Sequence, residues 1–179
     1  LATIVEEGLH LGPVVDGDVV KRPTRESLRM GIGADKPLVL GATDDEFTMT
    51  FADAERKLRW VPRSLLLRKL GLPKAARKRY LRDNADVVAL GKARLAGRIL
   101  TDMMFRVVVP RIAADRGAAP TWTYRFSWPS GRFGYAEHCL DVPFFFDCLD
   151  GPAMEPLAGP NPPQPLADGV AEFAPPVDD

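Results

Sequence analysis

Two side chains with the chemistry of an acid–base pair, Glu46 and His138, each follow a segment that has the pattern of a buried strand. The acid comes after an apolar run that ends near Ala42, and the histidine comes after an alternating run that ends near Ser127. In an open α/β sheet, reactive side chains collect at the carboxyl ends of the strands, so we expect these two to lie close together. A carboxylate on one ring nitrogen would fix the tautomer of the histidine and stabilise its cation, as a general base requires.

The order of the pair, acid first and base later, occurs in hydrolytic triads whose serine nucleophile precedes both. In the printed sequence no serine, cysteine or threonine lies in a Gly-x-Ser-x-Gly type of turn, and no glycine-rich loop offers N–H groups to an oxyanion. The serines are Ser27, Ser64, Ser127 and Ser130. Each residue therefore has a structural alternative to a catalytic role. His138 could be a hydrogen-bonded core histidine, and Glu46 could be a solvated loop acid.

Three segments have the pattern of strands. Residues 37–42 (PLVLGA) form a compact apolar run, which is typical of a buried parallel strand. Residues 121–127 (TWTYRFS) alternate aromatic, β-branched and polar side chains, which predicts a second core strand. Residues 11–20 (LGPVVDGDVV) predict a shorter strand that is broken by a turn at its Asp-Gly pair.

The clearest helical pattern covers residues 92–117, where apolar side chains recur at spacing four in two rows. Pro110 should kink this helix or shift its last turns, because proline has no N–H to donate. Residues 23–31 predict a short helix that ends at Gly31, and the basic stretch 56–82 predicts two or three short helices.

Three stretches of the sequence resemble the C-terminal portion of the type B carboxylesterases, the cholinesterase-like family of α/β-hydrolases. GPVVDGDVV resembles a P-x-x-D-G segment of that family. PLVLGATDDEF resembles the strand and loop that carry its triad acid. APTWTYRFSW, followed by GYAEHCLDVPFFF, resembles its last core strand and the segment that carries its triad histidine. The resemblance runs from about residue 11 to about residue 170.

The resemblance implies an α/β fold, the C-terminal part of an α/β-hydrolase fold with few core strands and flanking helices. It implies one incomplete domain over residues 1–179, in which residues 151–179 form a proline-rich, loop-like tail. By resemblance Glu46 is the catalytic acid and His138 the catalytic base, the substrate is a small carboxylic ester, and no metal or organic cofactor is needed. The sequence departs from the family where Phe47 replaces the glycine after the acid.

The distribution of charge is uneven, although the formal net charge is zero. Residues 56–82 carry eleven Lys and Arg and no acid, whereas residues 133–179 carry nine acids and no Lys or Arg. Trp60 and Tyr80 are too few aromatic residues for a nucleic-acid stacking platform, so we expect a solvated helical face and no nucleic-acid partner.

No stretch approaches the roughly 18 consecutive apolar residues of a membrane span, so no membrane partner is expected. Cys139 and Cys148 make no disulfide framework, and we expect two buried thiols in a reducing compartment. No signal-peptide pattern is present, which leaves the localisation open with the cytoplasm favoured.

Two functions follow from these observations. The first is carboxylic ester hydrolysis by a Ser-Glu-His triad, to which this chain supplies the acid and the base but not the nucleophile. The alternative is a non-catalytic, truncated esterase-like module for binding or interaction. Because two strands make a poor sheet alone, we expect an apolar patch along Val39 and Tyr124. The missing N-terminal half or a second copy of the chain would cover that patch.

Overall fold

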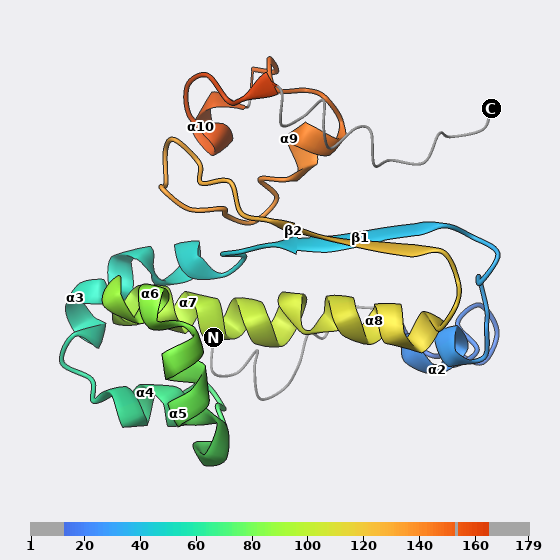
Figure 1. Cartoon of the computed structure of the whole chain (residues 1–179), viewed down its shortest axis with the longest axis horizontal. Helices are drawn as coiled ribbons and strands as arrows, with labels where there is room; N and C mark the ends of the chain where they lie inside the picture. The colour runs from blue at the N-terminus through green and yellow to red at the C-terminus, as the bar shows by residue number, and fades with distance from the viewer. Residues whose placement is uncertain (1–12, 153, 165–179) are drawn as a thin grey trace.

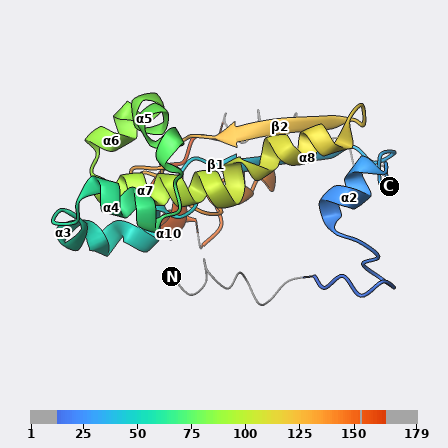
Figure 2. The ribbon, with the colours of Figure 1, turned by 90° about the horizontal axis from the view of Figure 1, so that it is seen from below.

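The computed structural model describes residues 13–152 and 154–164, which form a small parallel sheet with helices on both faces. The sheet pairs β1 (Leu38–Thr43) with β2 (Thr121–Phe126). A long helical row runs along one face, and two short helices lie over the other face (Figure 1). The row is α7 (Lys92–Thr101), η2 (Asp102–Arg106) and α8 (Val108–Arg116), and the short helices are α9 (Val142–Phe145) and α10 (Glu155–Ala158). Seen from below, α7 and α8 run alongside both strands (Figure 2).

The two strands are parallel and in register over their whole length, as the sequence predicts. Leu38 pairs with Thr121, and Thr43 pairs with Phe126. The prediction that the first strand is buried was only partly correct, because its first four residues are half-buried. Among the described residues β1 has a neighbouring strand on one edge alone, so most of the strand keeps some contact with solvent.

The strand predicted at residues 11–20 was wrong for its described part, because residues 13–20 contain no strand. The carboxylate of Asp16 instead accepts the N–H groups of Asp18 and Val20, at 2.9 and 3.0 Å. Such local side-chain bonds compete with a strand ladder. Val14 and Val19 are 75% and 85% exposed, so no packed surface favours an extended pairing here.

The predicted short helices are present. Residues 23–31 give α2 (Thr24–Arg29), after which Gly31 adopts a positive φ of 77°. The basic stretch gives α3 (Glu55–Leu58), α4 (Arg63–Lys69) and α5 (Lys74–Asp83), and all of its Lys and Arg residues except the half-buried Arg77 are exposed. Helix α6 (Ala85–Ala89) then leads into α7.

The long helical segment is interrupted before Pro110, as predicted. A π-helical turn, η2, separates α7 from α8. Proline at position 110 cannot donate to the carbonyl of Arg106 one turn earlier, so the regular helical ladder cannot continue through this point. A π-helical turn changes the direction in which the following side chains project, and such turns occur often at functional sites.

Two apolar clusters hold the sheet and the helices together. One packs the loops after β2 onto the sheet and consists of Phe126, Ala136, Leu140, Phe144, Leu149 and Ala158. The other packs α4 against α7 and consists of Leu67, Leu72, Leu95 and Ile99. An aromatic run such as Phe144–Phe146 is typical of a core, and here Phe144 is fully buried but Phe146 is 77% exposed. The pattern is misleading for Phe146, because α9 is one helical turn that presents one face to the sheet.

The predicted proline-rich tail is described as far as residue 164, and it contains the four-residue helix α10. Residues 165–179 lie outside the described residues. The division into one incomplete domain with a loop-like tail therefore stays a prediction.

Close approach between α7 and the 3-10 helix η1 (Thr48–Ala54) requires a glycine at position 97. A methyl group there would lie 2.5 Å from Thr48 Cα and 2.6 Å from Thr48 Oγ1. We predict that Gly97→Ala lowers the free energy of unfolding by about 1–3 kcal/mol in urea titrations, although alanine is the better helix former. Gly131→Ala is the control, since its new methyl would meet its nearest atom at 3.5 Å. Equal stabilities of both variants would contradict this account.

Candidate active site

The structure brings Glu46 and His138 together, as their positions after the two strands predict. Oε2 of Glu46 lies 2.5 Å from Nδ1 of the imidazole. The carboxylate side chain is 7% exposed and the imidazole 47% exposed. With Nδ1 engaged by the acid, Nε2 has no hydrogen-bond partner among the described residues. This is the arrangement in which an imidazole can take a proton from a donor on its outer side.

Backbone pairing that continues beyond the strands is what aligns the two loops. After β1, the N–H of Asp44 donates to the carbonyl of Phe126 at 3.0 Å. The N–H of Asp45 then donates to the carbonyl of Ala136 at 2.9 Å, and Asp45 forms a parallel bridge with Glu137. Glu46 and His138 are the residues that follow this bridge in each loop, so the bridge sets the distance between them.

The Glu46 carboxylate is also fixed by its own loop. Its Oε1 accepts the backbone N–H of Thr43 at 2.9 Å, which leaves Oε2 for the imidazole. The next residue, Phe47, donates its N–H to Oγ1 of Thr101 on α7 at 3.0 Å. Both bonds hold the loop against elements that are packed independently of the histidine, so the acid is already oriented when the two loops meet.

The His138 segment is less firmly enclosed. Cys139 has a positive φ of 62°, which is uncommon for a residue with a side chain, and Leu140 after it is fully buried. The edge of the imidazole meets the ring of Phe105, with ring centroids 5.9 Å apart, and Phe105 in turn lies against Phe47. Because Phe105 belongs to the π-helical turn η2, the interruption of the long helix places an aromatic ring beside the histidine.

The expectation of two buried cysteines was wrong, since Cys139 is exposed and Cys148 is half-buried. Burial of Leu140 in the core turns the neighbouring Cys139 side chain outward. The free thiols make no disulfide.

The two acids directly before Glu46, Asp44 and Asp45, are both engaged by other side chains. Arg125 donates from Nε and Nη2 to the two oxygens of Asp44, at 2.6 and 2.8 Å. Burial raises the pKa of Asp44, but the bonds from Arg125 and the charges of Arg98 and Arg106 outweigh it, so the pKa lies below its ordinary value. The adjacent Asp45 accepts the hydroxyl of Thr48 at 2.7 Å. These hydrogen bonds hold both acids that precede Glu46 in place.

Sequence reasoning missed Glu137, which is 3% exposed and whose Oε1 has no hydrogen-bond partner among the residues that the structure describes. Burial raises its pKa to about 7, against an opposing effect from the charge of Arg132. The signal in the sequence was an acid directly before His138, but nothing in that position indicates burial.

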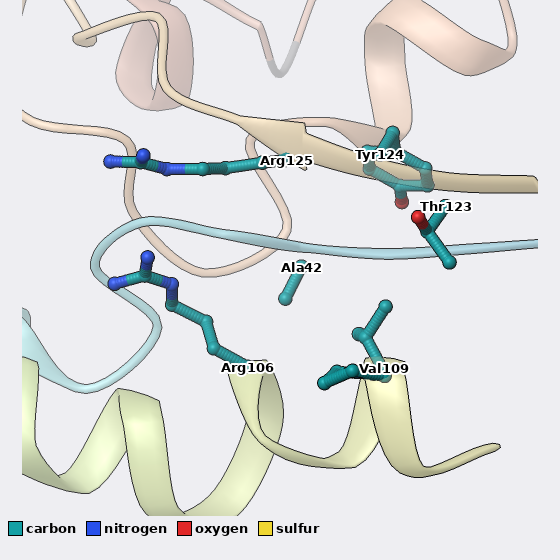
Figure 3. Close-up of a pocket in the computed structure, with 7 residues that line it drawn as sticks. Ala42, Arg106, Val109, Thr123, Tyr124 and Arg125 are labelled. Carbon is teal, nitrogen blue, oxygen red and sulfur yellow. The ribbon is translucent and has the colours of Figure 1, made fainter. Parts of the chain in front are cut away.

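Two hollows flank the sheet, and neither is lined by the acid–base pair. The first, about 290 Å³, lies between the strands and α8 and is bordered by Ala42, Thr123 and Val109 (Figure 3). Arg106 and Arg125 extend to the same side of it (Figure 3). The second is a groove of about 590 Å³ on the opposite side. The lining of this apolar groove includes Val39, Trp122, Tyr124, Phe126, Trp128 and Phe145. It lies where the sequence predicts an apolar patch.

Within residues 13–152 and 154–164, no group of three His, Cys, Asp or Glu side chains is arranged to hold a metal ion. No helix in these ranges is long and apolar enough to cross a membrane.

The known proteins to which this chain is similar are esterases. The chain is 30% identical over 149 residues to the para-nitrobenzyl esterase of Bacillus subtilis strain 168, an alignment that covers 80% of this chain and 29% of the relative. A crystal structure of the Geobacillus stearothermophilus carboxylesterase at pH 6.2 superposes with a TM-score of 0.66 and 26% identity, over 94% of this chain and 35% of that one. A solved para-nitrobenzyl (PNB) esterase shares the fold, with a TM-score of 0.53, 23% identity, and coverage of 91% and 33%. The chain thus spans about a third of the length of these relatives, and no profile of a known protein family matches it.

Ionisation of Glu137 should make the protein less stable as the pH rises. The folded state keeps a proton on this group up to about pH 7, whereas the ordinary value is 4.5, so the stabilisation is complete below about 4.5 and is lost between there and about 7. We predict that Glu137→Gln removes a decline in the free energy of unfolding on the order of 3 kcal/mol over this window.

The measurement is urea unfolding at a series of pH values, with the exposed Glu155→Gln as the matched control. The control should follow the wild type. A Glu137→Gln profile that also follows the wild type would show that this carboxyl is ionised in the folded protein.

Proposed function

We propose that the chain belongs to the type B carboxylesterase family and supplies the acid Glu46 and the base His138 for carboxylic ester hydrolysis. The observation that supports this most directly is the 2.5 Å contact between the buried carboxylate and Nδ1, while Nε2 has no partner in the part of the chain that the structure describes. A serine supplies the nucleophile from a segment other than these 179 residues, since none of the chain's own serines lies in a Gly-x-Ser-x-Gly turn.

In the proposed reaction, Nε2 of His138 removes the proton from the serine hydroxyl as its oxygen attacks the ester carbonyl. The imidazolium then donates that proton to the departing alcohol, which leaves an acyl-serine. Water, deprotonated by the same nitrogen, releases the carboxylic acid and regenerates the hydroxyl. Glu46 accepts the Nδ1–H throughout, which keeps the correct tautomer and stabilises the cation.

The chemistry of the pair needs no metal or organic cofactor, because each step moves a proton between His138 and an oxygen. The electrostatic setting supports the division of roles. Glu46 is held by an N–H donor and is nearly inaccessible, whereas the imidazole is half exposed on the side where a substrate could approach. A small apolar or aromatic ester would meet Phe105 and Phe47 beside the histidine.

We predict that, in the intact protein, His138→Gln lowers the turnover of p-nitrophenyl acetate by about 10⁶ and Glu46→Gln by about 10⁴. The base is lost in the first variant, whereas the second keeps an imidazole without its orienting carboxylate. Glu155→Gln is the control on an exposed acid and should leave turnover unchanged. Full activity of either active-site variant would contradict the assignment.

The alternative function, a non-catalytic interaction module, is separated from the first by complementation. We predict that the 179-residue chain alone does not turn over the ester and becomes active when a segment carrying the serine is added. A chain that stays inert with such a segment present would favour the non-catalytic module. Turnover by the chain alone, abolished in His138→Gln, would instead reveal a nucleophile within these residues.

The apolar groove supports a partner surface for the remainder of the enzyme or for a second copy of the chain. Trp122 in it is 51% exposed, an unusual state for a tryptophan in the middle of a strand. We predict that the chain binds a hydrophobic dye, that Trp122→Ala weakens this binding severalfold, and that Trp60→Ala does not, although Trp60 is 76% exposed. A compact monomer in sedimentation that binds no dye would count against this surface.

A further inference from the structure

The tyrosine of β2 that faces away from α8, Tyr124, is held in one position by its surroundings. Its ring lies across Gly41 of β1 so closely that a Cβ at position 41 would be 2.4 Å from the ring. On its other side the ring packs against Phe145 of α9, with centroids 4.7 Å apart. A ring confined between a strand and a helix has little rotational freedom, so its hydroxyl points to a fixed place.

That place is the carboxylate of Asp141, three residues after His138. The hydroxyl of Tyr124 donates to Oδ2 of Asp141 at 2.6 Å, the short distance expected for a bond to a charged acceptor. No other side-chain donor reaches this carboxylate among the described residues. The Asp141 carbonyl accepts the N–H groups of Phe144 and Phe145, so this residue also begins α9. Tyr124 therefore ties the start of α9 to the sheet.

The segment between His138 and Asp141 is held by this tie and by the packing of Leu140 in the core. Cys139 is exposed and holds an unfavourable positive φ, and Leu140 contributes one buried side chain. Backbone bonds inside the segment link Leu140 to Glu137 and Val142 to Cys139, which are local and do not anchor it to the sheet.

The carboxylates of Asp141 and Glu46 both act on the groups around His138. Burial raises the pKa of the Tyr124 hydroxyl, with further increases from its bond to Asp141 and from the charges of Asp141 and Glu46. The pKa of the Cys139 thiol is likewise raised by partial desolvation and then by the same two carboxylates. Both acids are therefore close to the histidine segment, and the phenol engages one of them.

We propose that Tyr124 is a positioning residue of the acid–base pair, whose hydroxyl anchors Asp141, and with it the segment that carries His138, so that the imidazole meets Glu46. This rests on the proposed function and adds a third element to it.

The test reads the tautomer of His138 directly, in the intact protein labelled with ¹⁵N-histidine. At alkaline pH, where the ring is neutral, the ring ¹⁵N shifts report whether Nδ1 or Nε2 carries the proton. The resonance is assigned by its loss in His138→Gln. In the wild type we expect the Nδ1–H form, and in Glu46→Gln a mixture of the two tautomers. A wild-type protein without the Nδ1–H form would overturn the proposed function itself.

With the wild-type pair established, Tyr124→Phe should shift His138 to a mixture of tautomers and lower kcat by about 10–100-fold with little change in KM. The ring stays over Gly41, so thermal unfolding should remain cooperative. Tyr135→Phe is the matched control, because the hydroxyl of Tyr135 has no hydrogen-bond partner within residues 13–152 and 154–164. A Tyr124→Phe protein with the wild-type tautomer and kcat would overturn the inference and leave the acid–base pair intact.

Asp141→Asn gives an independent check on the same contact. If Tyr124 acts through Asp141, the losses in kcat for Tyr124→Phe and Asp141→Asn should not add in the double variant. Additive losses would show that the tyrosine acts by another route and would overturn the proposal. Asp141→Glu should keep the wild-type tautomer if the longer acid still reaches the phenol, and this partial rescue would not follow from a purely structural role.

Discussion

The parallel pairing of β1 with β2, continued by the bridge between Asp45 and Glu137, is the constraint on which the rest of the structure depends. Strand pairing fixes residues 83 positions apart in the chain, since Leu38 lies opposite Thr121. The bridge carries the same register into two loops that could otherwise take many conformations. The contact between Glu46 and His138 is a consequence of that register and not of any local preference near either residue.

The register is maintained from both sides of the sheet by different forces. On the helix side, the close approach of Gly97 to Thr48 and the bond from Phe47 to Thr101 hold the acid loop against α7. On the other side, the apolar cluster under α9 holds the histidine loop, with Leu140 and Phe144 fully buried. Acid and base are therefore supported by separate packing, and the sheet couples them.

The charged groups near the pair illustrate how burial changes the chemistry of similar side chains. Asp44 is paired with Arg125 and keeps its charge. One oxygen of Glu137 has no partner in the described part of the chain, and this carboxyl retains its proton to about pH 7. Asp141 is engaged by a phenol. The four carboxylates near the histidine thus differ in exposure and in the groups that donate hydrogen bonds to them. Glu46 is the one whose oxygen contacts a ring nitrogen of His138.

The sequence by itself determined the two core strands, the short basic helices, the interruption near Pro110 and the identity of the two residues that meet. These follow from local patterns, because alternation, apolar periodicity and the missing N–H of proline act within a few residues. The resemblance of the DDEF and AEHCLD segments to an esterase family added the expected roles. The strand expected at 11–20 is absent from its described part, 13–20, because an acceptor side chain and exposed valines override its apolar pattern.

Only the tertiary structure decided what surrounds the pair. The edge contact of Phe105 with His138 and the bond from Tyr124 to Asp141 each join segments that are distant in the chain. Burial of Glu137 depends on the direction in which its loop turns. Exposure of Cys139 and Phe146 has the same origin, since a neighbouring core residue sets their direction. A sequence pattern specifies which side of a strand or helix is apolar. The position of a side chain in a loop depends instead on contacts that exist only after the sheet has paired.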